Sequence, residues 1–431
     1  MAKRHRSIAG DWESIFGRLQ ELVLANSGED EFQEIFKLVL AKLYAERFGD
    51  ANAFRARSEP RETAATINAL IAEAAHRWPG TLPGECRSLL ADEHLQVCVQ
   101  ALEPHPLLDA GLEVMDNAFE FLISKTAKGS KGQYFTPRHV VDACVRIVKP
   151  RAGESIADPA CGSAGFLVHA LLHRSERGDA AISAEQLWGF DFDVRAIEVA
   201  RALMVMAGDG QANVLRLNSL LTPSALGQIE VFPDVAETPR LTIEDVMRAR
   251  ADGFTGFDVI LTNPPFAGEV RERVLLDAYT LAGNGARAER DVLFLERCVG
   301  LLKPRGRLAI VLPHNKFAAS QWSRAREWLL RHMRVVAVLG LGRHTFLPHT
   351  AQKASVLFAE KRARPLTSPP DEELLFLISD EDGKDSRGRI VARPGTAFTD
   401  PVWVRADHDL AECVDSFDDF AERASLSGWL D

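Results

Sequence analysis

Short runs of β-forming residues alternate with helical runs after Thr126, and this alternation constrains the fold more than any other feature of the sequence. It is typical of a parallel sheet whose strands are joined by crossover helices. Helical runs such as VRAIEVARALMVMAGD and SQWSRAREWLLRHM separate the candidate strands. Seven strands are predicted, at residues 154–160, 186–193, 213–219, 257–263, 306–313, 335–342 and 354–361. We therefore predict an α/β fold built on a doubly wound, seven-stranded, Rossmann-like sheet.

The chain on either side of this pattern has a different character. Before it, apolar residues recur at helical spacing, as in WESIFGRLQELV and FQEIFKLVLAKL. We predict an N-terminal helical domain at residues 1–125 and an α/β domain at residues 126–362. Residues 221–256 are too many for a crossover loop and are interpreted as an insertion. Residues 363–431 are predicted to form a C-terminal extension, with LLFLISDEDGKDSRGRIV as a hairpin and DLAECVDSFDDFAERASL as an amphipathic helix.

The composition excludes several classes of protein. The chain has 431 residues, of which 46% are hydrophobic, enough to bury a large core. No stretch approaches the roughly 18 to 20 apolar residues that a membrane span needs, and MAKRHRSIAGDWES is not a signal peptide. The six cysteines are scattered, with no CxxC pair and no His/Cys cluster at zinc spacing. We expect a cytoplasmic protein with no membrane association, no disulfide framework and no metal site.

The net charge of −10 argues against a protein that binds DNA through its overall electrostatic field. Local basic clusters occur at Lys3, Arg4 and Arg6 and in KTAKGSKGQYFTPRH. For each cluster, the sequence supports phosphate contacts and a merely solvated charged surface equally well.

An acidic residue and a glycine turn follow the first predicted strand. Ligands of open α/β sheets bind beyond the carboxyl ends of the strands. Gly162 and Gly165 in the turn let a ligand approach the backbone, and the helix that follows offers free N–H groups. A carboxylate would repel a phosphate group, so Asp158 favours a ligand that carries a cationic amino group.

The second predicted strand ends in another acid, Asp191. An acid at this position can accept hydrogen bonds from the two hydroxyls of a ribose. The alternative role, capping of the following helix, suits Asp193 better. An adenosine with an amino-acid tail fits both Asp158 and Asp191, so S-adenosylmethionine is the expected cofactor.

The fourth predicted strand ends in Asn263, Pro264, Pro265 and Phe266. Proline donates no hydrogen bond to a neighbouring strand, so the two prolines force the chain out of the sheet as a rigid turn. The Asn263 side-chain oxygen and the Pro264 carbonyl can then converge on one planar amino group, while the Phe266 ring lies against its parent ring. Accepting both hydrogens directs the nitrogen lone pair towards an electrophilic methyl group.

Together these motifs resemble the amino-group DNA methyltransferases, and within them the modification subunits of type I restriction systems and related N6-adenine methylases. The similarity runs from about Gly129 to Lys361, in the order GQYFTPRHVV, DPACGSAGFL, GFDFD, LTNPPF and GRLAIVLP. The FTPR block directly upstream of the glycine turn is the most specific sign. The helical N-terminal region, with FQEIFKLVLAKLYAE, also looks like the helical domain of that family.

The resemblance implies roles for individual residues. Asn263, Pro264, Pro265 and Phe266 take the catalytic positions. Asn218 stands where relatives often have an acid beside the adenine of the cofactor. In the segment 344–358, a wall for the target base is expected, with structural roles for His344 and His349. The remaining cofactor-binding positions are Gln133, Tyr134, Phe135, Thr136, Pro137 and Arg138 at the methionine part, Asp158, Gly162, Ser163, Ala164 and Gly165 at the amino-acid end, and Asp191 at the ribose.

The activity implied by the resemblance is methyl transfer from S-adenosylmethionine to the exocyclic N6 of an adenine flipped out of DNA. Transfer is direct, without a covalent enzyme intermediate, and depends on proximity and alignment. The Asn-Pro-Pro-aromatic loop also suits other planar amines, namely cytosine N4, an RNA base or a protein glutamine. A different alternative is a non-catalytic assembly subunit that binds the cofactor as a structural ligand.

The resemblance also implies partners. The residues after the methyltransferase core are too few and too acidic for a base-reading module. We expect a separate specificity subunit, with or without a restriction subunit, to recognise the sequence of the double-stranded DNA. The C-terminal helix and the N-terminal domain are the expected docking surfaces, so truncation at about residue 405 should weaken partner binding and spare cofactor binding.

Overall fold

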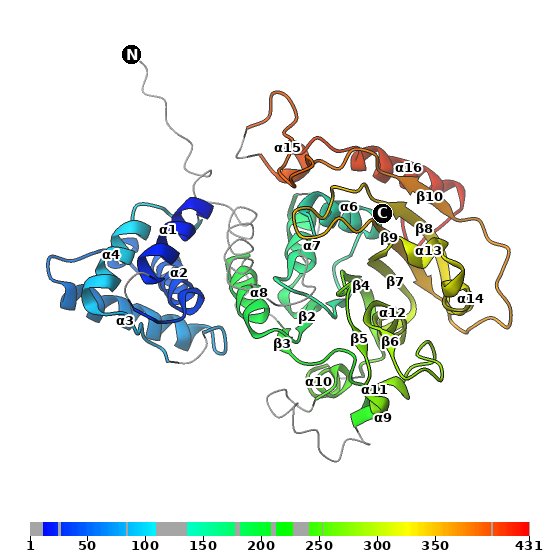
Figure 1. The fold of residues 1–431 in the computed structure, drawn as a ribbon, viewed down its shortest axis with the longest axis horizontal. Helices are drawn as coiled ribbons and strands as arrows, with labels where there is room; N and C mark the ends of the chain where they lie inside the picture. Colours follow the sequence, from blue (N-terminus) through cyan, green and yellow to red (C-terminus); the bar gives the residue numbers. More distant parts are fainter. Residues whose placement is uncertain are drawn as a thin grey trace. The chain divides into compact units, whose positions relative to one another are not determined.

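The computed structural model describes residues 12–24, 27–82, 85–108, 136–176, 182–207, 213–226, 241–251, 253–397 and 400–430. The chain forms two compact units (Figure 1), the first comprising Met1–Gly129, Glu198–Ala212 and Ala397–Pro401 and the second Ser130–Ile197, Asn213–Thr396 and Val402–Asp431. The site residues Gln133, Tyr134 and Phe135 and the end of the predicted helical domain, residues 109–125, lie outside the described residues. None of the helices within the described ranges has the length and apolar character needed to cross a membrane.

Helices with apolar residues at helical spacing build the first unit. They include α1 (Trp12–Leu24), α2 (Glu31–Phe48), α3 (Pro60–Arg77) and α4 (Asp92–Leu102). α2 is the most deeply buried of these four, with Phe32 and Phe36 fully inaccessible. Asp30 caps its N-terminus by accepting a hydrogen bond from the Gln33 amide at 3.0 Å. The helices predicted in these parts of the chain are confirmed.

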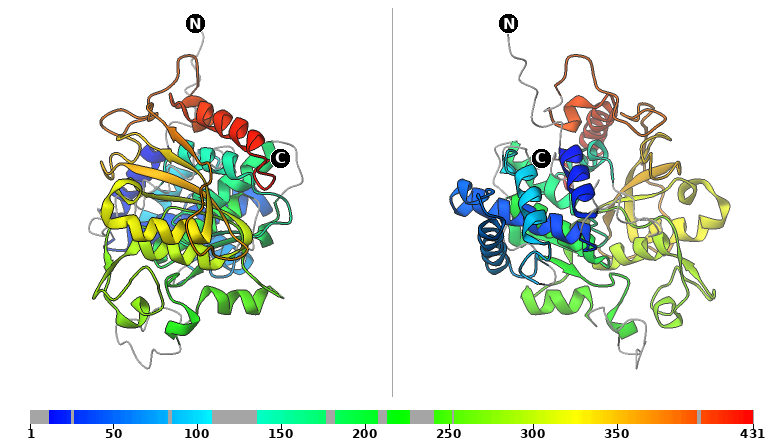
Figure 2. Two further views of the ribbon diagram at one scale, coloured as in Figure 1. Left: turned by 90° about the vertical axis from the view of Figure 1, so that its right-hand side faces the viewer. Right: turned by 60° about the vertical axis from the view of Figure 1, so that its left-hand side comes forward.

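The second unit is organised around an eight-stranded sheet (Figures 1 and 2). In spatial order its strands are β10-β8-β9-β7-β4-β1-β2-β3. All seven predicted strands are present, which confirms the α/β fold, and β10 adds an eighth strand at one edge. The bounds are β1 (Ile156–Asp158), β2 (Leu187–Asp191), β3 (Asn213–Arg216), β4 (Phe257–Thr262), β7 (Leu302–Pro313), β8 (Met333–Gly340), β9 (Ala354–Lys361) and β10 (Leu375–Ile378).

The direction in which strands are added to the sheet reverses at β1. From β1 the chain adds β2 and β3 in parallel on one side. β4 then pairs in parallel with the other side of β1, and β7 follows in parallel beyond it. The connections therefore leave β1 and β4 in opposite directions, which opens a crevice beyond their carboxyl ends. This is the doubly wound arrangement predicted from the sequence.

β9 lies between β7 and β8 and runs antiparallel to both. A parallel pair requires a long crossover connection, which is usually a helix. Residues 341–353 join β8 to β9 as a loop without a helix, so the chain returns in the opposite direction. The alternation of strands and helices in the sequence did not reveal this reversal.

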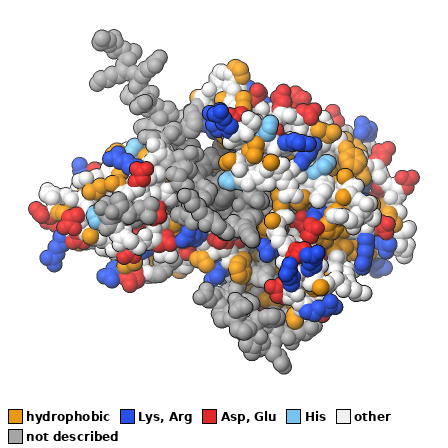
Figure 3. Space-filling model, viewed as in Figure 1, with side chains coloured by type: hydrophobic (Ala, Val, Ile, Leu, Met, Phe, Trp, Pro, Cys, Tyr) orange, Lys and Arg blue, Asp and Glu red, His pale blue; other side chains and the backbone are white. Residues whose placement is uncertain are grey.

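The segment LLFLISDEDGKDSRGRIV was expected to form a hairpin, and the structure changes this assignment. Its first part is β10, which pairs in parallel with β8 instead of folding back on the residues that follow. Antiparallel pairing occurs only later, as an isolated bridge between Lys384 and Ile390. In the view of Figure 3, hydrophobic side chains reach the surface in the region where Figure 1 labels β10.

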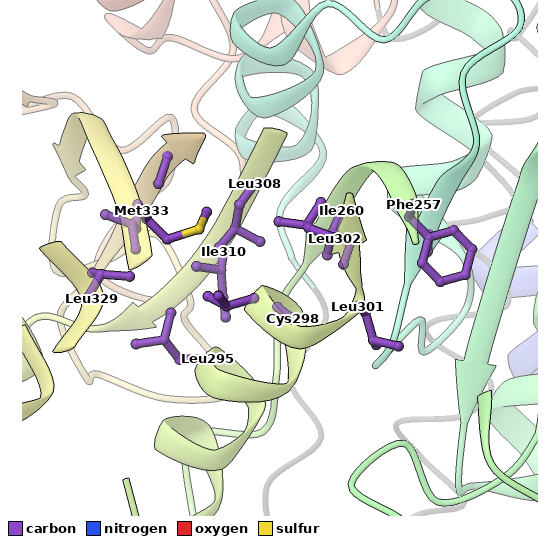
Figure 4. Close-up of a cluster of buried hydrophobic side chains, with 14 of the residues drawn as sticks. Phe257, Ile260, Leu295, Cys298, Leu301, Leu302, Leu308, Ile310, Leu329 and Met333 are labelled. Atoms are coloured by element: carbon purple, nitrogen blue, oxygen red, sulfur yellow. The ribbon is translucent and has the colours of Figure 1, made fainter. Parts of the chain in front are cut away.

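Helices cover both faces of this sheet. On one face, α6 (Arg138–Val148) packs on β4 and β7, and α7 (Gly165–Glu176) packs on β1, β2 and β4. The opposite face shares a buried apolar cluster with α10 (Ile243–Arg250), α12 (Arg290–Leu301) and α14 (Ser323–His332). Leu308 and Ile310 of β7 and Leu295 and Cys298 of α12 belong to this cluster (Figure 4). Burial on both faces accounts for the continuous apolar run in GRLAIVLP.

The predicted C-terminal amphipathic helix is α16 (Leu410–Arg423), preceded by α15 (Val402–Arg405). α16 packs on α6, and its apolar residues Phe417 and Phe420 are buried there. The rings of Phe417 and Trp429 lie 5.6 Å apart, and Trp429 is also fully buried. Truncation at about residue 405 would therefore remove part of the core of the second unit. Its effects on partner binding and cofactor binding stay predictions.

Phe417→Ala tests the contribution of α16 to this core. Loss of a fully buried ring removes its burial energy and leaves a cavity, so the free energy of unfolding should fall by about 3–5 kcal/mol. Phe376→Ala is the matched control, because the Phe376 side chain is 69% exposed. Urea denaturation followed by tryptophan fluorescence measures both changes, and equal destabilisation of the two variants would contradict this role for α16.

Candidate active site

A cavity lies within the second unit, at the carboxyl ends of β1 and β4 and at the starts of α6 and α7. It therefore occupies the crevice where the strand order reverses. Asp158 from the glycine-turn motif, Asn263 from the Asn-Pro-Pro-Phe motif and Thr136 from the FTPR block meet there. The full lining is Thr136, Arg138, Val141, Asp158, Ala160, Cys161, Gly162, Ser163, Gly165, Phe166 and Asn263.

Asp158 is the last residue of β1, and its side chain is almost completely buried. Burial raises the pKa of Asp158 to about 7, although the hydrogen bond that its Oδ1 accepts from the Ala160 amide, at 3.0 Å, opposes the shift. The carboxyl group is therefore close to half-protonated at neutral pH. A cationic group placed beside it would favour the ionised form, so the site is electrostatically suited to an ammonium ligand.

Asp191 ends β2, which neighbours β1 in the sheet. Its Oδ2 accepts a hydrogen bond from the Gly162 amide, and its Oδ1 accepts one from the Asp193 amide, both at 2.9 Å. Burial raises the pKa of Asp191, and these two amides oppose that shift. Asp191 does not line the cavity itself, but it is bound directly to Gly162, which does.

Asp193 has the capping role that the sequence favoured for it. Its Oδ1 accepts a hydrogen bond from the Ala196 amide at 2.9 Å, in the first turn of α8 (Val194–Met206). This leaves the Asp191 carboxylate at the strand end, beside the glycine turn.

The Arg138 guanidinium occupies the space beside Gly165 in the glycine turn. A Cβ atom at Gly165 would lie 2.1 Å from a guanidinium nitrogen of Arg138, which is buried and also lines the cavity. Gly162 has φ +51°, and a Cβ there would meet nothing within 4 Å. The absence of a side chain at Gly165 therefore admits the guanidinium, a role that the sequence did not indicate.

Ala164 adopts a backbone conformation that favours glycine. Its φ is +67°, which costs an L-residue with a side chain roughly 1–2 kcal/mol. The side chain is fully buried and does not line the cavity. The turn thus accommodates an alanine in this conformation at the expense of local strain.

Asn263 follows the last residue of β4 and connects two motifs that are distant in the sequence. Its Nδ2 donates a hydrogen bond to the Thr136 hydroxyl at 2.9 Å, 127 positions away in the chain. This bond uses the amide nitrogen and so fixes the plane and direction of the amide group. Pro264 is buried and Pro265 is half-buried, consistent with a turn held in place on leaving the sheet.

Phe266 packs against an aromatic residue that the sequence did not single out. Phe266 and Phe346 are both buried, and their rings meet edge to face at 5.6 Å, with an interplanar angle of 69°. Phe346 lies within the segment 344–358, where a pocket wall was expected. His344 instead lies 3.4 Å from Asp382, and neither it nor the exposed His349 lines the cavity.

Asn218 comes directly after Leu217, whose amide donates a hydrogen bond to the Asp191 carbonyl at 2.9 Å. It follows β3, and its Oδ1 accepts a hydrogen bond from the Leu220 amide at 3.1 Å, which closes a local turn. It does not line the cavity. Pro137, Pro264, Pro265 and Phe266 are also absent from the lining, although Pro137 lies between Thr136 and Arg138 in the chain and Pro264 directly follows Asn263.

Phe192 is a further residue that the sequence reasoning missed. It directly follows Asp191, is 57% exposed, and has the Arg216 guanidinium 5.9 Å from its ring centre. An exposed phenylalanine next to this acid presents a flat apolar face at the carboxyl end of β2. Phe192 lies inside the GFDFD motif, and that position could have indicated a role in the site.

Within the residues that the structure describes, no group of three or more histidines, cysteines or acids is placed to hold a metal ion. The charged groups that line the described cavity are Asp158 and Arg138, one of each sign. The geometry therefore suits an organic ligand that carries both an ammonium and a carboxylate.

Comparison with known proteins agrees with this geometry. The family model for N-6 DNA methylase matches residues 111–391. The chain belongs to the N-6 DNA methylase family. The EcoEI methylase subunit of a type I restriction enzyme from Escherichia coli is 26% identical over 240 residues, which cover 54% of this chain and 43% of that protein. The chain thus spans less than half the length of this curated relative.

Two solved structures share the fold. The methyltransferase subunit of a type I restriction-modification system from Streptococcus thermophilus matches 98% of this chain and 98% of its own, with a TM-score of 0.57 and 15% identity. A Listeria monocytogenes protein described as a class I S-adenosylmethionine-dependent methyltransferase matches 86% of this chain and 93% of its own, with a TM-score of 0.57 and 15% identity. The fold class predicted for the N-6 DNA methylase chain is therefore confirmed.

Asp158→Asn tests the electrostatics of the cavity in the chain freed of small molecules. Because the pKa of Asp158 is raised to about 7, its contribution to stability is present below about pH 4 and is lost as the pH rises through 7. The asparagine keeps an acceptor for the Ala160 amide and cannot ionise. Its free energy of unfolding should exceed that of the parent by a few kcal/mol at about pH 8 and match it at about pH 4.

Asp258→Asn is the control for this measurement. Its pKa is lowered, despite partial burial, by hydrogen bonds from Lys303 and Ser155, so its ionised form stabilises the fold at neutral pH. This variant should be less stable than the parent at pH 8. If Asp158→Asn is likewise no more stable than the parent at pH 8, burial does not destabilise the ionised Asp158 carboxylate, which would contradict its raised pKa.

Proposed function

We propose that this chain is an S-adenosylmethionine-dependent DNA methyltransferase that modifies the exocyclic N6 of an adenine flipped out of double-stranded DNA. The observation that carries the proposal is the meeting of Asp158, Thr136 and Asn263 in one cavity. Residues suited to the cofactor and residues suited to a planar amine thus lie within reach of each other. Membership of the N-6 DNA methylase family supports the same reaction.

The residues around the cavity fit the cofactor group by group. Asp158 suits the ammonium of its amino-acid end and Arg138 suits the carboxylate, because the two side chains carry opposite charges in the same cavity. Asp191 suits the ribose hydroxyls, since carboxylate oxygens that each accept one amide retain further acceptor capacity. Phe192 supplies an exposed ring for the adenine. When bound, S-adenosylmethionine supplies an electrophilic methyl group on a sulfonium sulfur.

The Asn263 loop orients the amine that is methylated. The Asn263 oxygen and the Pro264 carbonyl accept the two N–H hydrogens of the adenine amino group, which turns the nitrogen lone pair out of conjugation. Thr136 holds the Asn263 amide through its nitrogen, and the diproline turn fixes the backbone. Phe266, backed by Phe346, supplies an apolar wall for the base.

Alignment provides most of the acceleration in this scheme. Unstacking the adenine costs a few kcal/mol, which aromatic contact and the two hydrogen bonds offset. The aligned nitrogen would take the methyl carbon directly as its bond to sulfur breaks, so no covalent intermediate with the protein would form. The methylated nitrogen then loses its proton, and no side chain is required to remove it before transfer.

The wider assignment follows from the relatives. The EcoEI protein is named as a subunit of a restriction enzyme, and we extend that role to this chain as a modification subunit. A separate specificity subunit then reads the DNA sequence, with or without a restriction subunit, and the protein acts in the cytoplasm. Catalysis is assigned to residues 126–362, with 221–256 as an insertion, 1–125 as a helical domain and 363–431 as an extension.

Asn263→Ala tests the acceptor role. The methylation rate should fall roughly 10²–10³-fold or more, because one of the two acceptors for the amino group is lost. The dissociation constant for S-adenosylmethionine should change little, since the cofactor contacts remain. Transfer of a labelled methyl group to DNA, together with calorimetric titration of the cofactor, separates the two effects. The control Asn213→Ala, at the start of β3, should behave as the parent.

The same labelling assay distinguishes the alternatives. Parallel reactions offer adenine-containing DNA, DNA whose only exocyclic amine is cytosine N4, RNA, and protein, each with the specificity subunit present. Methylation of DNA adenine alone is expected. Preferential methylation of another amine would show that the proposed substrate is wrong. Cofactor binding without any turnover would support a non-catalytic subunit. An Asn263→Ala variant that retains full turnover would overturn the acceptor role.

Phe192→Ala tests the adenine face of the cofactor site. Loss of the exposed ring should weaken S-adenosylmethionine binding roughly tenfold, within the range of base–aromatic stacking energies. Stability should be preserved, because the side chain is 57% exposed. Titration calorimetry measures the affinity, with Phe376→Ala as a matched exposed control. Unchanged affinity in Phe192→Ala would show that the ring does not contact the cofactor.

A further inference from the structure

The edge strand β10 exposes two large apolar side chains on one face. Phe376 is 69% exposed and Ile378 is 67% exposed, whereas Leu377 between them is buried. Alternate residues of a strand point to opposite faces of the sheet, so Phe376 and Ile378 lie side by side on the same face. Large apolar residues grouped at the surface are a feature of interaction sites.

This exposed face continues the core of the second unit. The register pairs Phe376 with Val338 and Ile378 with Gly340 of β8, so the Phe376 and Ile378 side chains lie on the same face as that of Val338. Val338 is buried in the apolar cluster that includes Leu329 of α14. The helix layer thus covers Val338 of β8 and leaves the Phe376 and Ile378 side chains exposed.

The outer edge of β10 is less suited to a partner than this face. The Ser379 amide donates to the Gly340 carbonyl, which places the backbone groups of residues 375, 377 and 379 towards β8 and those of 376 and 378 outwards. The outward carbonyl of Ile378 is 4.0 Å from the Cys413 sulfur of α16. α16 thus occupies part of the edge and hinders addition of another strand. A helix lying across the face would instead extend the layer formed by α12 and α14.

Charge at the ends of β10 determines which helix fits. Exposed carboxylates precede the strand at Asp371 and Glu373, and others follow it at Asp380 and Glu381. Glu372 is bound by Arg362 and does not add to this charge. A second copy of the same face would bring acids against acids, so the complementary partner carries basic residues beside its apolar stripe.

We propose that the face of β10 formed by Phe376 and Ile378 docks a basic amphipathic helix from a partner protein. The helix places its apolar stripe on these two side chains and its lysines or arginines beside the acidic ends of the strand. This docking site is separate from the cavity at β1 and β4, and it does not depend on the methylation proposed for that cavity. The partner assembles with the chain through this face while the cavity stays open.

A peptide-binding experiment tests the proposal on the full chain. The probe is a fluorescent helical peptide with leucines at i, i+3, i+4 and i+7 and lysines at the stripe margins, and binding is followed by anisotropy. The parent chain should bind this probe, and Phe376→Thr combined with Ile378→Thr should weaken binding at least tenfold. Threonine is favoured in strands, so the variant should fold, as circular dichroism would verify.

Matched controls make each outcome decisive. Val404→Thr changes a residue of α15 that is 48% exposed and should leave binding unchanged. A probe with glutamates in place of the lysines should bind at least tenfold more weakly than the lysine probe. Equal binding of the lysine probe by the parent and the double variant, or no binding by the parent, would overturn the proposal.

Light scattering tests whether a second copy of the chain, instead of a partner helix, occupies this face. The parent should be no more self-associated than the double variant, because the acidic ends of two copies repel. A parent dimer that the double variant abolishes would assign the face to a second copy and overturn the proposed heterologous helix. Cofactor binding should be the same in parent and variant, so a failure of the methylation proposal can be recognised separately.

Discussion

The hydrogen bond between Asn263 and Thr136 is the interaction on which the proposed site depends. It joins the loop after β4 to the segment before α6, across 127 residues of sequence, at a length of 2.9 Å. The order of strands makes it possible, since β4 and β1 are neighbours and their carboxyl ends open into the same crevice. The bond engages the nitrogen of the Asn263 amide and thereby sets the direction of its oxygen.

Local sequence signals predicted the elements of this site well. The diproline turn, the glycine turn and the strand-end acids are short-range features whose backbone demands can be read from a few adjacent residues. The sheet pattern then placed Asp158 and Asn263 at the same edge, and the cavity contains both. The capping role of Asp193 was also visible, because N-cap chemistry involves residues only three positions apart.

Long-range packing was not predictable in the same way. Phe346, which contacts Phe266, lies in the loop that joins β8 to the antiparallel strand β9, and nothing in the local pattern indicates that reversal. The close approach of Arg138 to Gly165 likewise depends on how α6 packs beside α7. Asn218 was placed by analogy with relatives, and its side chain closes a local turn outside the cavity. The burial of the apolar face of α16 against α6 is likewise a long-range contact, and its polar face stays a predicted docking surface.

The most direct test is a crystal structure of the chain with S-adenosylhomocysteine, the product that remains after the methyl group has left. The account predicts its ammonium against Asp158, its ribose hydroxyls against Asp191 and its sulfur turned towards Asn263. Binding at a site away from this crevice, or with the sulfur directed away from Asn263, would contradict the claim that one cavity brings the methyl donor and the acceptor amine together.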